Sequence, residues 1–434
     1  MRPLVSRMNT LRIFVWLLAI HTACGSLRAV DRSEIETQTL DPDPIEIRLK
    51  DLPRPRHSEN ANKSPDVVRI PDHPTLNVPK GFRVKIFADK LTHPRWLALT
   101  PEGDVLVTET PKNRIRILRD KDGDGVADET AVFASEAEGL NIPFGMAFSE
   151  GFFYLANSDA VLRWAFQKGQ LQLRGRGEKV AALPEGGYHQ HWTRNVRVGP
   201  DGHLFVTIGS ESNCSVEPSP RASVQRMDLD GAHMETFASG LRNPVGLDFH
   251  PVSHEAYVTV NERDGLGDDL PPDYFTRIRS GEFFGWPYVY LSPDLADPRF
   301  TKRKEDNLPE ELIRKTRTPD VLIQAHSAAL GLAFYQGKTF PAHYQNGAFV
   351  ALRGSWNRSN GTGYKIIFIP FGDDNRPRGY YEDFVTGFLL DPKTPTTWGR
   401  PVGMLCLPDG SILFTEESNN RIYRVQFDAA NPAP

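Results

Sequence analysis

A short phrase recurs six times along this chain, and the repetition constrains the fold more than any other feature. In each copy a Pro or small residue opens an apolar run, a turn follows, and a second apolar run ends in Thr, Ala or Arg. The first four copies recur at a spacing of roughly 50 residues, and insertions stretch the last two, as is typical of propellers and other repeat arrays. The copies begin at Pro94, Pro143, Thr193, Pro244, Ala329 and Pro401.

Each copy predicts a strand, a turn and a second strand, because apolar runs rich in Val, Phe, Leu and Ile flank turn-forming residues. Further strand-like runs follow some of the copies, at 114–118, 161–166, 364–371 and 421–427. Four short strands in each of six units predict an all-β fold: a six-bladed β-propeller with four antiparallel strands per blade. A β-sandwich is the alternative, but it leaves the repeated phrase unexplained.

The first 29 residues predict a secretion signal. Three arginines, Arg2, Arg7 and Arg12, precede an apolar stretch at 13–20 that is too short to span a bilayer. Cleavage after Ala29 is one outcome, and a lipoprotein signal with lipid attachment at Cys24 is the other. We therefore expect an exported protein, periplasmic or extracellular, with or without a lipid anchor.

The rest of the chain divides by composition. Residues 30–75 are polar and proline-rich, which predicts a linker. Residues 76–428 would form the propeller catalytic domain, and 429–434 a tail. The net charge of −4, with no basic stripe, argues against a nucleic-acid partner. Cys214 and Cys406 fall in opposite repeats, so no disulfide is expected.

A ring of repeats predicts where a binding site lies. The loops that lead into the innermost strands and those that join second to third strands open on one face, and polar residues gather in them. Arg242, Arg353 and Arg400 would approach the axis from successive blades. Their convergence would need a multiply anionic ligand. The alternative is that each arginine pairs with a carboxylate, such as Glu262, Asp264 or Glu416.

His191 is the best candidate for proton transfer, because imidazole titrates near neutral pH and this residue lies in a loop that lines the channel. His189 and His326 are the competing candidates. The sequence contains no Gly-x-Ser-x-Gly elbow, phosphate-binding glycine loop or dinucleotide fingerprint.

Two acidic loops are candidate calcium sites. The loop 264–269 could offer oxygen ligands from Asp264, Gly265, Asp268 and Asp269, and a solvated turn is the alternative. A second loop places Asp120, Asp122, Asp124 and Asp128 at alternating positions. It lacks the glutamate expected at its last position, so an acidic hairpin is the alternative there.

Taken together, these loops resemble the glucose/sorbosone dehydrogenase family, soluble six-bladed quinoproteins that use pyrroloquinoline quinone (PQQ) and calcium. The resemblance covers about 78–427, and six motifs carry it in order: 191–202, 241–247, 264–269, 281–287, 354–358 and 400–403. It implies that Arg242, Asn243, Arg353 and Arg400 bind the quinone, a tricarboxylate.

The resemblance also implies roles for the ion and the base. Calcium near Asp264 and Gly265 would polarise the quinone carbonyl. His191 would remove the proton of the substrate hydroxyl while hydride passes to the quinone. The implied activity is oxidation of a small-molecule sugar at the expense of an unidentified electron acceptor.

Several positions depart from the glucose-oxidising branch. Ser210 stands where that branch has an Asp that orients the base, Val245 and Leu140 replace glutamines, and Arg353 stands near a Lys position. The base would then be oriented by another group, Glu109 or Glu211 being the candidates. The pattern lies nearer the sorbosone branch, so an aldose or sugar aldehyde is the expected substrate.

Two interpretations from other classes stay open. Six-bladed propellers also carry calcium-dependent lactone hydrolysis, which needs no organic cofactor. A secreted propeller that has lost catalysis and serves as a binding module is the third interpretation, favoured by Ser210 and the missing glutamines.

Overall fold

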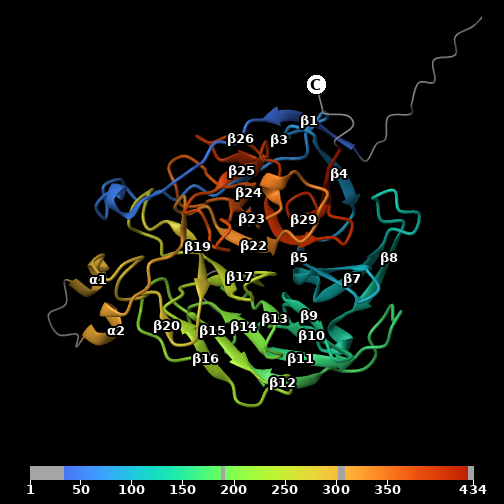
Figure 1. The fold of residues 1–434 in the computed structure, drawn as a ribbon, viewed down its shortest axis with the longest axis horizontal. Helices are drawn as coiled ribbons and strands as arrows, with labels where there is room; N and C mark the ends of the chain where they lie inside the picture. Colours follow the sequence, from blue (N-terminus) through green and yellow to red (C-terminus); the bar gives the residue numbers. More distant parts are fainter. Residues whose placement is uncertain (1–33, 187–190, 302–307, 429–434) are drawn as a thin grey trace, which may run out of the picture. The chain divides into compact units, whose positions relative to one another are not determined.

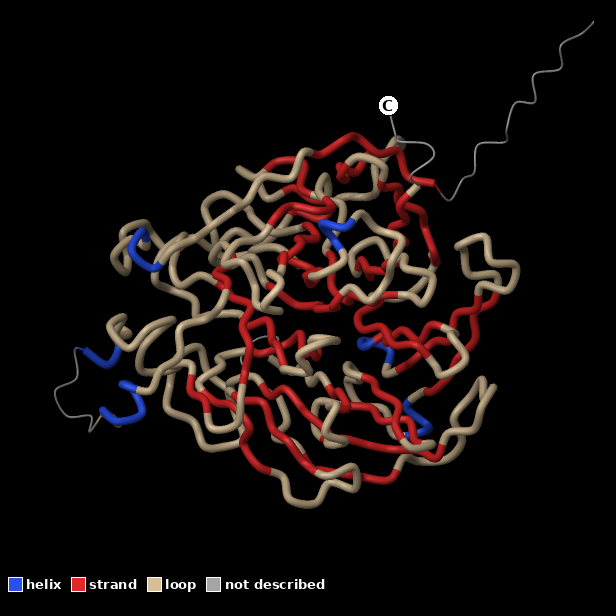
Figure 2. Tube along the Cα trace, in the orientation of Figure 1, coloured by secondary structure: helices blue, strands red, loops and turns tan. Residues whose placement is uncertain are grey.

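Antiparallel strands form nearly all of the regular structure in the computed structural model, which describes residues 34–186, 191–301 and 308–428 (Figures 1 and 2). The predicted secretion signal, His189 and the predicted C-terminal tail lie outside the described residues. No helix in the described part of the chain is long and apolar enough to span a membrane. The short helices are η1 (Leu49–Asp51), η2 (Thr110–Lys112), η3 (Glu136–Glu138), α1 (Pro298–Thr301), α2 (Glu310–Arg314) and η4 (Ala342–Tyr344).

Each copy of the phrase opens one of six sheets, and its two apolar runs form the first two strands of that sheet, with two more strands following in order. The all-β prediction is confirmed, and the number of blades stays a prediction. The six series are β5 (Pro94–Leu99), β6 (Val105–Glu109), β7 (Arg114–Arg119), β8 (Glu129–Ala134); β9 (Met146–Ser149), β10 (Phe152–Ala156), β11 (Ala160–Ala165), β12 (Glu178–Ala182); β13 (Val196–Val198), β14 (Leu204–Ile208), β15 (Ser223–Met227), β16 (Glu235–Ser239); β17 (Pro244–Phe249), β18 (Ala256–Val260), β19 (Asp273–Ile278), β21 (Val321–Ile323); β22 (Ala329–Phe334), β23 (Gly347–Leu352), β24 (Lys365–Pro370), β25 (Glu382–Val385); and β28 (Pro401–Cys406), β29 (Ile412–Glu416), β30 (Arg421–Phe427), β4 (Phe82–Ala88).

The sixth series joins the two ends of the repeat region, because β30 pairs antiparallel with β4, which precedes the first copy of the phrase. Val425 lies opposite Val84 in this register, and both side chains are fully buried. The C-terminal and N-terminal parts of the repeat region are thereby held in one sheet.

The structure corrects the linker prediction for residues 34–75. In this segment β1 (Glu34–Leu40) pairs with β3 (Thr75–Pro79) and β4, and β2 (Asp66–Val67) pairs with β27 (Thr396–Thr397). Sheet edges bind a strand through its backbone, so a polar composition does not prevent pairing. The two remaining strands are β20 (Glu282–Phe283) and β26 (Leu389–Asp391).

Glycines in or next to the first strands allow neighbouring sheets to approach closely. A Cβ atom at any of four glycines would overlap the backbone of the first strand of the next sheet, or the residue just before it. The glycine of the repeated phrase is therefore a packing requirement. The pairs are Gly145 with Asn195 and Val196, Gly246 with Leu330, Gly331 with Val402, and Gly403 with Arg95.

The threonine that ends the phrase joins neighbouring sheets by hydrogen bonds. Thr259 Oγ1 accepts from the Gly246 N–H at 2.8 Å and donates to the Leu330 carbonyl of the next sheet at 2.7 Å. Thr415 repeats this arrangement with Gly403 and Arg95, both at 2.7 Å. Each hydroxyl thus links two strands of its own sheet to the first strand of its neighbour.

The first strands contact one another in the order β5, β9, β13, β17, β22, β28 and back to β5. Figure 1 shows β5, β9, β13, β17 and β22 toward the centre of the picture. Five apolar side chains from five of these strands or the residues beside them form one cluster, with Trp192 packed against it. They are Trp96, Phe144, Val245, Leu330 and Val402.

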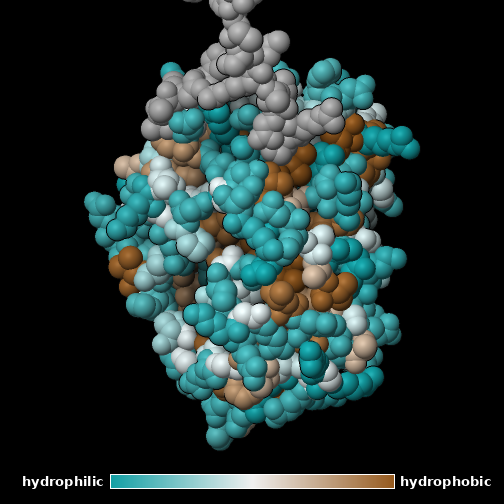
Figure 3. All heavy atoms as spheres, turned by 90° about the vertical axis from the view of Figure 1, so that its right-hand side faces the viewer, coloured by the Kyte–Doolittle hydropathy of each residue, from teal (hydrophilic) through white to brown (hydrophobic). Residues whose placement is uncertain are grey.

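Buried apolar clusters join neighbouring sheets, as Val107 with Leu413 and Tyr154 with Val206 illustrate. The face in Figure 3 is largely hydrophilic, with separate apolar patches. Cys214 and Cys406 are both free thiols, as expected.

Replacing Thr259 by Val should destabilise the protein, because the Gly246 N–H and the Leu330 carbonyl would be left buried without a partner. The expected loss is about 1–3 kcal/mol in the free energy of unfolding, measured by urea denaturation. Thr39→Val, at an exposed position of β1, is the matched control and should change that free energy by less than about 0.5 kcal/mol. Equal effects of the two substitutions would contradict this role for Thr259.

Candidate functional site

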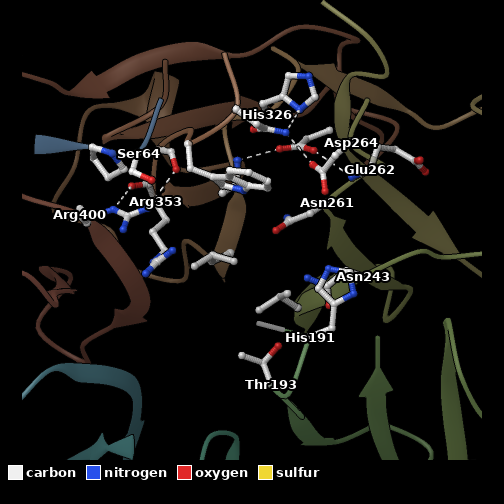
Figure 4. Close-up of a pocket in the computed structure, with 18 of the residues that line it drawn as sticks. Ser64, His191, Thr193, Asn243, Asn261, Glu262, Asp264, His326, Arg353 and Arg400 are labelled. Atoms are coloured by element: carbon white, nitrogen blue, oxygen red, sulfur yellow. Dashed lines mark hydrogen bonds between the residues drawn. The ribbon is translucent and has the colours of Figure 1, made fainter. Parts of the chain in front are cut away.

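A cavity of about 570 Å³ opens beside the central apolar cluster (Figure 4). Val245 and Leu330 belong to the cluster and also line the cavity. Its walls come mainly from the loops that the repeat identified, those leading into first strands and those between second and third strands. Six of the residues predicted to act in catalysis or to bind the cofactor or metal line it: His191, Arg242, Asn243, Asp264, Arg353 and Arg400.

The expected calcium loop is only partly in the cavity. Asp264 lines it, whereas Gly265, Asp268 and Asp269 do not. The Asp268 carboxylate accepts from the Ser359 N–H at 3.0 Å, and Asp269 pairs with Arg358 at 2.7 Å. These two aspartates therefore hold the neighbouring 358–359 segment and do not converge with Asp264.

The second candidate calcium loop lies outside the cavity. Asp120, Asp122 and Asp124 place one carboxylate oxygen each within 4.8 Å of one another, and among the described residues no other group of three His, Cys, Asp or Glu does so. Asp128 is not part of the group, since its carboxylate accepts from the Lys121 N–H at 2.7 Å. Arg424 lies 3.3 Å from Asp120 and balances part of the charge.

His191 is buried, 6% exposed, and Ser210 sets its orientation. Its Nδ1 lies 3.2 Å from the Ser210 carbonyl and 3.1 Å from Ser210 Oγ. Since a carbonyl only accepts, and Oγ donates its own proton to the Ser212 carbonyl at 2.7 Å, Nδ1 must carry the proton. In the neutral ring Nε2 is then the basic nitrogen.

Neither glutamate expected to orient the base does so. Glu109 is fully buried and pairs with Arg114 and Arg116, while Glu211 is exposed. Ser210, one of the residues that depart from the glucose-oxidising branch, orients the base itself. The backbone of His191 is held in turn by Arg194, which donates to the His191 carbonyl at 2.7 Å.

The competing candidate His326 has both ring nitrogens engaged. Nε2 lies 2.9 Å from the Gly267 carbonyl, so it donates, and Nδ1 then accepts from Asn357 Nδ2 at 3.1 Å. Burial lowers the pKa of His326. These contacts indicate a structural role for His326.

Three arginines surround one carboxylate at the end of the cavity away from Asp264 and His326 (Figure 4). Arg353 Nε donates to Glu417 Oε1 at 2.5 Å, Arg95 pairs with the second oxygen, and Arg400 Nη1 lies 4.0 Å from Oε1. The four side chains are between 1% and 13% exposed. In the described part of the chain, Arg353 Nη1 and Nη2 have no hydrogen-bond acceptor, and Arg95 Nε is buried without one.

This guanidinium cluster, Arg95, Arg353 and Arg400 around Glu417, carries an excess of buried positive charge. Burial and the neighbouring Arg353 lower the pKa of Arg400 to about 10. Burial works to raise the pKa of Glu417, but the arginines outweigh it and hold that pKa well below the ordinary value. Buried cations in excess are costly unless an anion compensates them, so the cluster is suited to an anionic ligand.

Arg242 behaves differently from these three. Its Nε donates to the Asn213 carbonyl at 3.0 Å, Nη1 to the Glu262 carbonyl at 2.5 Å, and Nη2 to Asn213 Oδ1 and Asp264 at 2.9 and 3.1 Å. These bonds tie together loops of two sheets. Arg242 thereby shapes the cavity wall on its acidic side, which Glu262, Asp264 and Asp273 line.

Sequence reasoning missed Arg95 and Glu417. Of the carboxylates it named as alternative partners of the arginines, Asp264 does pair with Arg242. Glu416, another of these carboxylates, instead accepts from three backbone N–H groups, including that of Arg400 at 2.8 Å. The sequence did offer a sign that Arg95 is unusual. It occupies the second position of the phrase, where four of the other five copies carry Phe, Val or Leu. No local pattern distinguishes Glu417 from its neighbour.

The fold and the cavity together define a propeller-like all-β protein with a histidine and a guanidinium cluster in one cavity. The model of the TrAA12-like family matches residues 76–271 and 296–428, and the chain belongs to this family. It is 32% identical over 374 residues to an uncharacterized protein of Borreliella burgdorferi. The aligned region covers 82% of this chain and 91% of that protein.

A more distant relative is the pyrroloquinoline quinone-dependent pyranose dehydrogenase of Coprinopsis cinerea, 24% identical over 336 residues, or 68% of this chain and 45% of that protein. The structure of its PQQ domain in the holo form superposes with a TM-score of 0.68 at 19% identity, covering 84% and 99% of the two chains. The PQQ-bound aldose sugar dehydrogenase of Streptomyces coelicolor gives 0.55 at 16% identity, covering 80% and 99%. The likeness to these structures shows a common fold.

The buried carboxyl group of Glu262 should make the stability of the protein depend on pH. Burial raises the pKa of Glu262, and likewise that of Asp273, to about 7. The folded state therefore binds protons more tightly than the unfolded state, and the contribution of Glu262 to stability falls as the pH rises from about 4.5 through 7. The free energy of unfolding of Glu262→Gln, relative to that of the wild type, should therefore rise by up to about 3 kcal/mol between pH 5 and pH 8.

The measurement is the free energy of urea unfolding at both pH values, in chelator. Glu59→Gln, at an exposed position, is the control and should show no such change. A difference between wild type and Glu262→Gln that stays constant with pH would rule out this titration.

Proposed function

We propose that this protein is a PQQ-dependent dehydrogenase that oxidises a sugar at a CH–OH group. The observation that carries the proposal is the guanidinium cluster, three buried arginines around one carboxylate, in the same cavity as a histidine whose Nδ1 is fixed by Ser210. The relatives named above as quinone-dependent sugar dehydrogenases support the same class of reaction.

We further propose that the six sheets are the blades of a six-bladed propeller. The cyclic order of contacts between the first strands and the β30–β4 pairing support this arrangement. In such a ring the loops of successive blades meet at one face, which accounts for a cavity lined by residues as distant as His191 and Arg400.

The residues present fit a tricarboxylate quinone. Arg353 and Arg400, joined by Arg95, would hold its carboxylates, since guanidinium groups bind carboxylates through paired hydrogen bonds. Asn243 also lines the cavity, and its Oδ1 is buried without a hydrogen bond in the described residues. When bound, the quinone supplies the acceptor for hydride, and the protein supplies position and charge.

His191 acts as the general base in this proposal. Nδ1 donates to Ser210, so Nε2 accepts the proton of the substrate hydroxyl, and the imidazolium that forms keeps its Nδ1–H bond to Ser210. Ser210 is neutral, so it orients the ring without the added basicity that a carboxylate partner would give.

Calcium enters the proposal at the acidic side of the cavity. Asn261, Glu262, Asp264 and Asp273 line that side, and Glu262 Oε1 is buried without a hydrogen bond in the described part of the chain. Carboxylate and amide oxygens are the ligands that calcium prefers. A cation there would replace the protons that burial favours on Glu262 and Asp273.

The substrate we propose is an aldose or a sugar aldehyde of the sorbosone type. Lactone hydrolysis on a calcium ion is less well supported, because a cluster of cationic side chains has no role in that reaction.

The test combines reconstitution with catalysis. Purified apoprotein is incubated with PQQ, with and without calcium, and a panel of aldoses and sugar aldehydes is assayed by reduction of an artificial electron acceptor. We expect quinone absorbance to stay with the protein and calcium to increase turnover. Loss of the quinone on gel filtration together with no sugar-dependent reduction would refute the proposal, and lactone hydrolysis with calcium alone would favour the hydrolase.

Two substitutions should separate the base from the anion site. His191→Ala should lower kcat by about 10²–10⁴-fold with quinone retention unchanged, as expected for loss of a general base. Arg353→Ala should weaken quinone binding by about 10- to 100-fold, since it removes charge-assisted hydrogen bonds. His233→Ala, an exposed histidine outside the cavity, is the control. Quinone loss in His191→Ala would overturn the role assigned to this residue.

We also propose that the protein is exported, because of the arginines and the apolar stretch in the first 29 residues. Mass spectrometry of the mature protein should show a new N-terminus after Ala29, or a lipid-modified Cys24. An intact first 29 residues on the mature protein would refute export by this route.

A further inference from the structure

One wall of the cavity comes from a part of the chain that the family match does not include. The segment 56–68, here called the strap, lies before residue 76, where the family match begins. Four of its residues line the cavity: Asn62, Ser64, Pro65 and Val67. Nothing in the family match or the repeated phrase accounts for them.

The strap is bound to loops on both sides of the cavity. On one side the Arg56 N–H donates to the Leu266 carbonyl at 2.7 Å, and the N–H groups of Gly267 and Asp268 donate to Asn60 Oδ1 and Ser58 Oγ at 2.9 and 2.7 Å. Part of the acidic loop 264–269, expected to bind calcium, is thus the docking site of the strap.

Gly267 is required for this docking. Its φ is +104°, and a Cβ atom there would lie 2.8 Å from Ser58 Oγ and 3.0 Å from the Ser58 carbonyl oxygen. Any side chain at this position would push the strap away from the loop.

On the other side, Lys63 and β2 hold the strap. The Lys63 N–H donates to the Trp356 carbonyl at 2.7 Å, and Lys63 Nζ to the Ser359 and Lys393 carbonyls at 2.9 and 3.0 Å. β2 then pairs with β27. Because backbone and side-chain hydrogen bonds fix the strap on both sides, it is a preformed wall of the cavity.

The cavity is graded from a buried interior to an exposed rim. Arg242, His191 and Arg400 are 2%, 6% and 9% exposed, whereas Val67 and Trp356 are 44% and 36% exposed. Figure 4 shows Ser64 of the strap beside Arg353 and Arg400. A tightly held anionic cofactor suits the interior. The ligand that enters and leaves in each turnover must pass the rim.

We propose that the strap and Trp356 form a sugar-binding rim, in which Asn62 and Ser64 hydrogen-bond hydroxyl groups of the substrate and Val67 and Trp356 pack against its apolar ring face. A sugar ring offers both kinds of surface, and this combination of amide, hydroxyl, aliphatic and aromatic groups complements it. The inference rests on the proposed function, and it assigns selection among sugars to a segment outside the family match.

The test uses the full-length, quinone-loaded protein with D-glucose, D-galactose and maltose. Asn62→Ala and Ser64→Ala should each raise KM for the preferred sugar about threefold to tenfold, the effect of one lost hydrogen bond, and leave kcat and quinone retention unchanged. Trp356→Ala should change the ranking of the three sugars by kcat/KM. Glu59→Ala, an exposed strap residue that does not line the cavity, is the control.

Two results would overturn the inference while the wild type still oxidises sugars. One is an unchanged KM and ranking in all three rim variants. The other is a loss of quinone retention in Asn62→Ala or Ser64→Ala, which would place the strap on the cofactor.

If the wild type oxidises no sugar, the proposed function fails, and calorimetry of the apoprotein with the same three sugars decides the inference separately. Binding by the wild type that Trp356→Ala abolishes supports the rim. An absence of binding by the wild type overturns it.

Discussion

The close approach of the six first strands is the constraint on which the rest of the structure depends. Glycines at 145, 246, 331 and 403 bring neighbouring sheets into backbone contact, and Thr259 and Thr415 carry hydrogen bonds across two of these contacts. Loops that leave these strands are thereby held within one cavity although they are far apart in the chain. Strand packing and site geometry have the same physical origin.

The cavity combines two opposite electrostatic environments. At one side Arg95, Arg353 and Arg400 outnumber their single partner Glu417, and at the other side burial raises the pKa values of Glu262 and Asp273. An excess of buried cations favours an anion, and buried carboxylates favour a proton or a metal cation. This separation of charge is what a bound anionic quinone next to a divalent cation would require.

Much of the site could be predicted from the sequence, and the failures have a common cause. The phrase located the first two strands of each of the six sheets that it opens, and it placed His191, Arg242, Arg353 and Arg400 in loops that share a cavity. The sequence did not identify Ser210 as the group that orients His191, because a serine in place of an acid gave no indication that its hydroxyl and carbonyl would both reach Nδ1. Asp268 and Asp269 were misleading for a related reason. An acidic, glycine-rich loop has the composition of a cation site, but these carboxylates bind Arg358 and Ser359, about ninety residues away.

The sequence by itself determined the first two strands of each repeat and the loops in which the functional residues gather, because periodicity and turn chemistry are local properties that each copy of the phrase repeats. Only the tertiary structure decided which charges meet and which segments close the cavity. Glu417 rather than Glu416 faces Arg95, at a separation of 322 residues. A polar segment that resembles a linker supplies the strap. Such pairings depend on the positions of groups brought together by long-range packing, so no local pattern encodes them.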